Sequence, residues 1–127
     1  MKKNTLIFFF IVLSFLGAAQ EFSRKDSLRG NLSEFRTCYD VTFYDLFVMV
    51  DHHEKSLEKS YNIIHFNVVS DFDKMQIDLA QNMEIMLIKF KGVELEFSRE
   101  FDAVFIDLPR VLERGEQANI KVWYSGY

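Results

Sequence analysis

The sequence is poor in cysteine, proline and glycine. Its single cysteine, Cys38, has no partner within the chain, so no intrachain disulfide can form. The single proline, Pro109, is expected to end a strand because proline cannot donate to a sheet. The five glycines stand singly along the 127 residues. This scatter excludes a glycine-rich loop of the kind that cradles phosphate groups.

Basic residues are also outnumbered. The sequence has fifteen Lys and Arg and nineteen Asp and Glu, which gives a formal net charge of −4. The phosphate backbone of a nucleic acid requires a basic face on the protein that binds it. The charge balance therefore argues against a nucleic-acid partner.

The first nineteen residues have the pattern of a signal peptide. Lys2 and Lys3 precede the apolar run Leu6–Leu16, and the small residues 17–19 follow it. A transmembrane anchor would be the alternative, but a bilayer span needs about 20 apolar residues and this run is shorter. We predict a helical signal peptide over residues 1–19, cleaved after Ala19. The product would be exported, periplasmic or extracellular, with no stable membrane span.

Cleavage would leave 108 residues with a formal net charge of −6, because Lys2 and Lys3 are the only charged residues removed. That length suits one domain. Residues 20–38 are polar and unperiodic, and we predict an extended lead-in there. Residues 39–127 alternate with a period of two, which is typical of strands. Seven strands are expected, over Val41–Val50, Tyr61–Val69, Met75–Leu79, Met83–Phe90, Glu94–Phe97, Ala103–Leu108 and Ile120–Tyr124.

Seven short strands with almost no helical signal indicate an all-β fold, either a β-sandwich or a barrel-like pair of sheets. We predict an antiparallel β-sandwich, incomplete within this chain. The alternation also assigns a core face to four strands. The residues expected on that face are Tyr44, Leu46, Val48, Val50, Ile64, Phe66, Val68, Met75, Ile77, Leu79, Ile120, Val122 and Tyr124.

The segment Asp51-His52-His53-Glu54 has the residue types of a metal site. His53-Glu54 begins the H-E-x-x-H pattern, in which two histidines one helical turn apart hold zinc and the glutamate acts as base. Leu57 stands where the second histidine is needed, and the segment is expected to be a loop between strands. We interpret it as a solvated turn.

Three further candidates have ordinary structural explanations. His65 is expected on the outer face of its strand, with no second ligand nearby. Cys38 has no local His or Asn partner, so we predict a buried, inert thiol. Asp71 and Asp73 could be paired carboxylates, but two acids beside a strand turn are usually turn residues. We therefore predict no catalytic, cofactor-binding or metal-binding residue in this chain.

Several segments together resemble the aminopeptidase N-like (gluzincin) zinc metallopeptidases, in particular their exported bacterial members. The resemblance begins near Ser27 and extends to Tyr127, and no single motif in it is diagnostic. The segments that carry it are Cys38–Leu46 with Val48 and Val50, Met75–Leu79, Arg99–Phe101, Ala103–Asp107 and Ile120–Gly126.

The resemblance implies that this chain is the N-terminal β-sandwich of such an enzyme, truncated before the catalytic domain. In that family the sandwich packs on a thermolysin-like domain and helps to enclose the substrate cleft. The zinc ligands, the general base and the loop that recognises the substrate's amino terminus all lie downstream. No functional residue is therefore carried over to this sequence, and zinc and peptide substrates are expected only for the intact parent protein.

A second hypothesis comes from a different class of protein. The chain could be a complete secreted β-sandwich that binds a sugar, a peptide or a protein partner through its loops. The sequence has no motif of its own for that function, beyond the β pattern and the export signal.

Overall fold

The computed structural model describes residues 23–127, so the predicted signal peptide lies outside the described residues. Two short helices precede nine strands. Their bounds are α2 (Arg24–Gly30), α3 (Glu34–Thr37), β1 (Tyr39–Phe47), β2 (Val50–Asp51), β3 (Ser56–Val68), β4 (Phe72–Asp78), β5 (Met83–Phe90), β6 (Val93–Glu94), β7 (Phe97–Glu100), β8 (Ala103–Leu112) and β9 (Gln117–Gly126).

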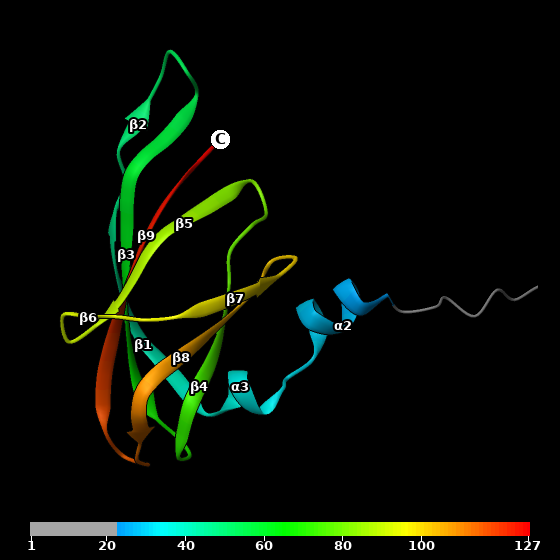
Figure 1. Ribbon diagram of the computed structural model, residues 1–127, viewed down its shortest axis with the longest axis vertical. Helices are drawn as coiled ribbons and strands as arrows, with labels where there is room; N and C mark the ends of the chain where they lie inside the picture. Colours follow the sequence, from blue (N-terminus) through cyan, green and yellow to red (C-terminus); the bar gives the residue numbers. More distant parts are fainter. Residues whose placement is uncertain (1–22) are drawn as a thin grey trace, which may run out of the picture.

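The strands form two antiparallel sheets that face each other (Figure 1). The six-stranded sheet has the order β1-β3-β9-β5-β6, and β2 pairs with the outer part of β3. The three-stranded sheet has the order β4-β8-β7. This arrangement confirms the predicted all-β, antiparallel sandwich.

The core lies between the sheets and uses side chains from both. In β3 the alternating residues Ile64, Phe66 and Val68 are buried, as predicted. Ile120, Val122 and Tyr124 of β9 are buried in the same way. The smaller sheet contributes other fully buried side chains, including Met75, Val104, Ile106 and Leu112. The period-two pattern therefore identified the buried side chains of β3 and β9, the strands that have the opposite sheet in front of them.

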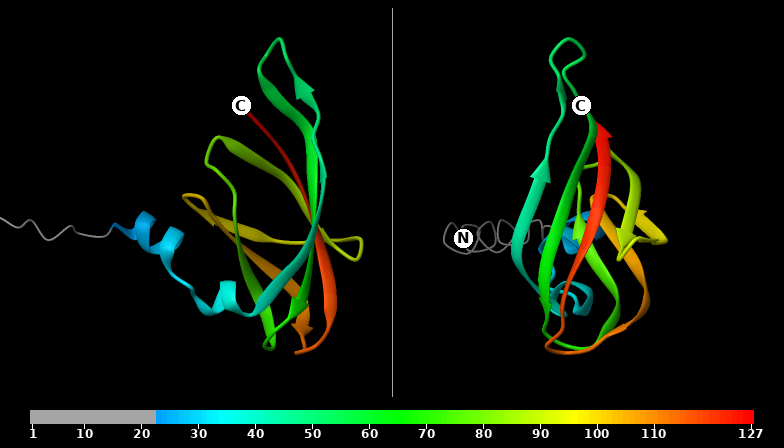
Figure 2. Two further views of the ribbon diagram at one scale, coloured as in Figure 1. Left: turned by 180° about the vertical axis from the view of Figure 1, so that it is seen from behind. Right: turned by 90° about the vertical axis from the view of Figure 1, so that its left-hand side faces the viewer.

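The predicted core face of the first strand is wrong. Tyr44, Leu46, Val48 and Val50 are exposed, although Tyr39 and Val41 at the start of β1 pack against the core. β1 is an edge strand whose register with β3 shifts between Val41 and Phe43. Beyond this shift the long sheet extends past the three-stranded sheet, as both views in Figure 2 show. Alternation indicates which side chains share a face, but not whether anything covers that face.

Pro109 does not end its strand, because β8 continues to Leu112. The pairing of β8 with β4 shifts between Lys74↔Asp107 and Phe72↔Leu112, so the residues around Pro109 bulge out of the ladder. On its other side, β8 pairs with β7 only as far as Ile106. No hydrogen bond of the ladder requires a backbone N–H at this position. The missing N–H of proline therefore costs the strand little stability.

The other strand predictions hold with small changes. β5 has the predicted bounds, Met83–Phe90. The segment expected as one strand over Glu94–Phe97 is divided between β6 and β7. In β4 both Met75 and its neighbour Gln76 are buried, although alternation placed Gln76 on the exposed face.

The lead-in explains the burial of Gln76, because it is helical instead of extended. Ser23 caps α2 through a capping box with Asp26, a local pattern that stabilises the first turn. Phe35 of α3 packs edge-on against Phe105 of β8, with ring centroids 5.9 Å apart. The Gln76 side chain contacts the lead-in through Ser33 Oγ, at 3.3 Å. The lead-in thus covers the outer face of the smaller sheet.

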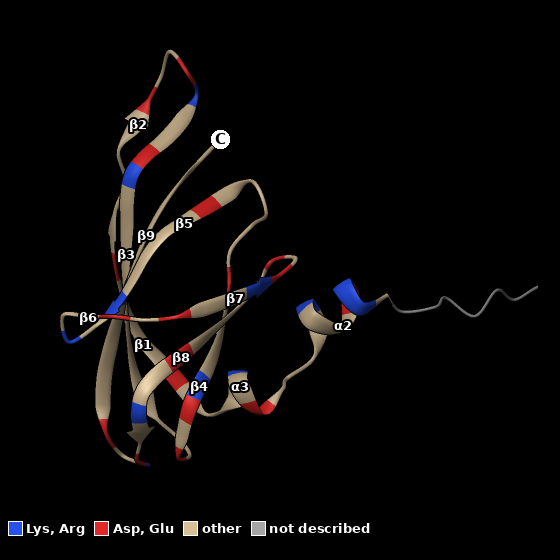
Figure 3. Ribbon diagram, in the orientation of Figure 1, with Lys and Arg blue, Asp and Glu red and all other residues tan. Residues whose placement is uncertain are grey.

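Helix α2 is held to the sandwich mainly by charge, since none of its residues is buried. Arg24 Nε donates to Glu100 Oε1 at 2.9 Å, and Arg29 Nε donates to Asp102 Oδ2 at 2.8 Å. In Figure 3 the acidic tip of the β7–β8 hairpin lies toward the basic helix. The hydrogen bonds from the arginines lower the pKa of Glu100 and of Asp102.

We expect α2 to leave the sandwich in acid. Carboxylates with a lowered pKa stabilise the docked state above their ordinary pKa, about 4, and this contribution is lost as the pH falls further. The protection of the α2 amides, measured against the intrinsic exchange rate at each pH, should therefore decrease below about pH 4, and at neutral pH in high salt. Asp102→Asn should decrease this protection already at pH 7, whereas Asp73→Asn, at an exposed position of β4, should not. Equal protection at pH 7 and pH 3 would contradict this prediction.

Candidate functional site

The structure places the Asp51–Glu54 segment in the turn between β2 and β3. Asp51 Oδ1 accepts hydrogen bonds from the backbone N–H groups of His53, at 2.8 Å, and Glu54, at 3.1 Å. The carboxylate is therefore engaged in closing the turn. The rings of His52 and His53 lie 3.8 Å apart, centroid to centroid. Among residues 23–127, no three His, Cys, Asp or Glu side chains gather where they could hold a metal ion.

The other sequence candidates lie apart from one another. Asp71 accepts from the backbone N–H of Arg114 at 2.8 Å, so it joins two turns. Asp73 is exposed on β4. His65 is half-buried on the outer face of β3, with its ring centroid 5.6 Å from that of Phe43.

Cys38 is buried, as expected from the sequence. Its thiol lies 3.5 Å from the carbonyl oxygen of Phe35. Burial raises the pKa of this thiol to about 11, so it stays protonated near neutral pH. A protonated, buried thiol is a poor nucleophile.

No helix in the described part of the chain is long and apolar enough to span a bilayer.

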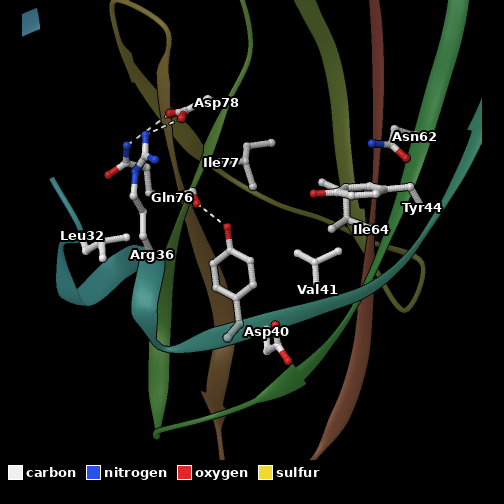
Figure 4. Close-up of a pocket in the computed structure, with 11 residues that line it drawn as sticks. Leu32, Arg36, Asp40, Val41, Tyr44, Asn62, Ile64, Gln76, Ile77 and Asp78 are labelled. Carbon is white, nitrogen blue, oxygen red and sulfur yellow. Dashed lines mark hydrogen bonds and ion pairs between the residues drawn. The ribbon is translucent and has the colours of Figure 1, made fainter. Parts of the chain in front are cut away.

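A hollow opens between the edge strands of the two sheets, and sequence reasoning missed it. It has a volume of about 520 Å³ and lies between β1 and β3 on one side and β4 and the lead-in on the other (Figure 4). We call it the inter-sheet cleft. Its lining residues are Leu32, Arg36, Tyr39, Asp40, Val41, Tyr44, Asn62, Ile64, Gln76, Ile77 and Asp78.

Two polar atoms in this cleft are buried without a hydrogen-bond partner. Arg36 pairs through Nη2 with Asp78 and donates to the carbonyl of Leu28 at 2.9 Å, but its Nε–H has no acceptor. Across the cleft, Oδ1 of Asn62 has no donor. An unsatisfied buried polar group costs about 1–3 kcal/mol. Both atoms have almost no accessible surface, so they lie behind the lining of the cleft.

Two of the titratable side chains in the cleft are engaged with partners. Tyr39 donates its phenol proton to the carbonyl of Gln76 at 2.6 Å, and burial raises its pKa to about 12, so it stays neutral. Asp78 forms an ion pair with Arg36. General base catalysis needs a free acceptor of suitable pKa beside the reacting group, and the side chains of Tyr39 and Asp78 are already engaged. The geometry is suited to holding a ligand.

Next to the cleft lies an uncovered apolar surface on β1 and its connection to β2. Its seven apolar side chains are between 42% and 62% exposed. They are Phe43, Tyr44, Leu46, Phe47, Val48, Met49 and Val50, which we call the β1 apolar surface. In β1 these side chains alternate between the two faces of the sheet edge, and exposed apolar side chains gathered at such an edge often mark an interaction site.

The outer face of the sheet extends this surface with aromatic rings. Phe47 stacks on Tyr61 at 5.1 Å between ring centroids, and Tyr61 lies 6.3 Å from Trp123 of β9. Lys121 Nζ sits 3.5 Å from the centroid of the Tyr61 ring, where the cation is attracted to the ring face. On this outer face, aromatic side chains thus extend from β1 across β3 to β9.

The fold is that of a two-sheet antiparallel β-sandwich with an open edge. No family model and no curated protein matches the sequence. Solved structures do match it, among them an M1 zinc metallopeptidase from Deinococcus radiodurans, at 21% identity over 71% of this chain with a TM-score of 0.62. A mutant of that enzyme bound to a Tyr-Ser-Ala substrate matches 72% of this chain at 21% identity and a TM-score of 0.63.

A two-domain M1 zinc metallopeptidase mutant bound to L-arginine gives a similar result, with 22% identity over 72% of this chain and a TM-score of 0.62. In each case the match covers only 21% of the solved chain. This chain therefore spans about a fifth of the length of the structures that it matches. At such low identity the likeness establishes the fold.

Proposed function

We propose that this chain is the non-catalytic N-terminal β-sandwich segment of an exported, zinc-dependent aminopeptidase. The fold that it shares with part of the M1 zinc metallopeptidases carries the proposal. The motif resemblance between Cys38 and Gly126 supports the same family independently of the coordinates. The pattern of residues 1–19 supports export, to the periplasm or beyond the cell.

Zinc does not fit the residues that this segment supplies. No suitable group of metal ligands occurs among residues 23–127, so the ion and the peptide-hydrolysing groups would belong to a catalytic domain of the same polypeptide. In the intact parent, zinc would polarise the peptide carbonyl and activate water. The sandwich would serve as scaffold and as part of the cleft wall.

The decisive experiment begins with the coding sequence beyond Tyr127. We expect an open reading frame with an H-E-x-x-H motif followed by a further glutamate. The full product should hydrolyse an aminoacyl p-nitroanilide, and a chelator should abolish that activity. Residues 20–127, purified alone, should hydrolyse none. A stop codon directly after Tyr127, or hydrolysis by the short product itself, would refute the proposal.

A further inference from the structure

We propose that the outer edge of β1 takes up one extended strand of the polypeptide that follows Tyr127, and that this strand also covers the β1 apolar surface and the mouth of the inter-sheet cleft. The proposal rests on the proposed function, because it requires a longer parent protein. It goes beyond that function by naming the surface of the sandwich that receives the rest of the chain.

The edge itself is open and unprotected. β1 is the last strand in the order β1-β3-β9-β5-β6, so its backbone groups on the side away from β3 have no partner strand in the described part of the chain. Soluble proteins usually protect such an edge with charges, proline or a covering segment. From Thr42 to Val50 the only charge is Asp45 and there is no proline. At the opposite end of the sheet, β6 is only two residues long.

The chemistry of the surface indicates a polypeptide occupant. Tyr44 and Leu46 pair with the inward-facing positions Ile64 and Asn62 of β3, whereas Phe47 pairs with Tyr61 on the outer face. An added strand places alternate side chains on the two faces, so it would cover both sets at once.

The position of Tyr127 favours the following segment of the same polypeptide. β9 ends at the same end of the sheet as the exposed half of β1, and Figures 1 and 2 show the C-terminus there. Only β3 and β1 lie between β9 and a strand added at the outer edge of β1. Three strand spacings amount to roughly 14 Å, which about four to five extended residues can cross. A second copy fits less well, because each mature chain would bring Asp45 and a net charge of −6 to the contact.

The test compares the full parent with the chain that ends at Tyr127, by hydrogen exchange of the amides of residues 43–47 that point away from β3. We expect exchange about 100-fold slower in the parent. Leu46→Lys in the parent should restore fast exchange there, and Tyr44→Lys should do the same. Val111→Lys, at an equally exposed apolar position of β8, should have no effect on it. Unchanged melting of the short chain with each substitution would show that the fold tolerates them.

Each outcome separates this inference from the proposed function. An active, zinc-dependent parent with unprotected residues 43–47 would overturn the docking edge alone. A parent that protects these residues but hydrolyses no peptide would support the edge and refute the proposed function. If the short chain sediments as a dimer with residues 43–47 protected, the occupant is a second copy and the inference is wrong. A reading frame that stops at Tyr127 would refute both the docking edge and the proposed function.

Discussion

Phe66→Ala is expected to remove a large part of the stability of the sandwich. The Phe66 ring is 1% exposed, and it packs against the rings of Tyr39 and Phe72, at centroid distances of 5.4 Å and 6.2 Å. Truncating a buried phenylalanine to alanine leaves a cavity and costs about 3–5 kcal/mol. A domain of this size has about 5–15 kcal/mol in total. Urea denaturation followed by far-UV circular dichroism would measure the loss.

The matched control is Phe43→Ala, on the neighbouring strand. The Phe43 side chain is 60% exposed, so its removal creates no cavity in the core. We expect a change within about 0.5 kcal/mol, as for most surface substitutions. Similar losses for the two variants would show that the core does not lie where the structure places it.

Arg99→Ala is expected to loosen the crossing between the two sheets. The Arg99 guanidinium donates to the carbonyl oxygens of Leu79, Ala80, Met83 and Phe101, at 2.6 to 2.9 Å. Leu79 and Ala80 belong to the connection from β4 to β5, where the chain passes from the smaller sheet to the larger one, and Met83 is the first residue of β5. Hydrogen bonds from a charged donor contribute about 1.5–3 kcal/mol each, and the partly exposed carbonyls here can turn to water instead.

We therefore expect a net loss of about 2–3 kcal/mol for Arg99→Ala, with faster hydrogen exchange between residues 79 and 83. Arg99→Lys should recover only part of it, because an ammonium cannot reproduce the planar fork of a guanidinium. Arg114→Ala, at an exposed turn position, should stay within about 0.5 kcal/mol. The explanation would be wrong if Arg99→Ala unfolded at the same urea concentration as the unaltered chain.

Local patterns were enough to predict the strands and the antiparallel sandwich. Alternation in β3 and β9 identified the buried faces, because a side chain's face follows directly from its place in an extended strand. The extended lead-in, predicted because residues 20–38 are polar and unperiodic, is wrong, because a capping box at Ser23 and contacts with β4 and β8 support helices there. The predicted end of a strand at Pro109 is wrong, because the bulge there removes the need for the hydrogen bond that proline cannot make.

The candidate site depended on tertiary structure. Arg36 and Asn62 are 26 positions apart in the sequence, and nothing local to either indicates that both line one cleft. The β1 apolar surface likewise depended partly on the sequence and partly on tertiary structure. The sequence by itself determined that Tyr44 and Leu46 share a face, because alternation is a property of one strand. Only the tertiary structure decided that this face is open, because coverage depends on where the second sheet stops.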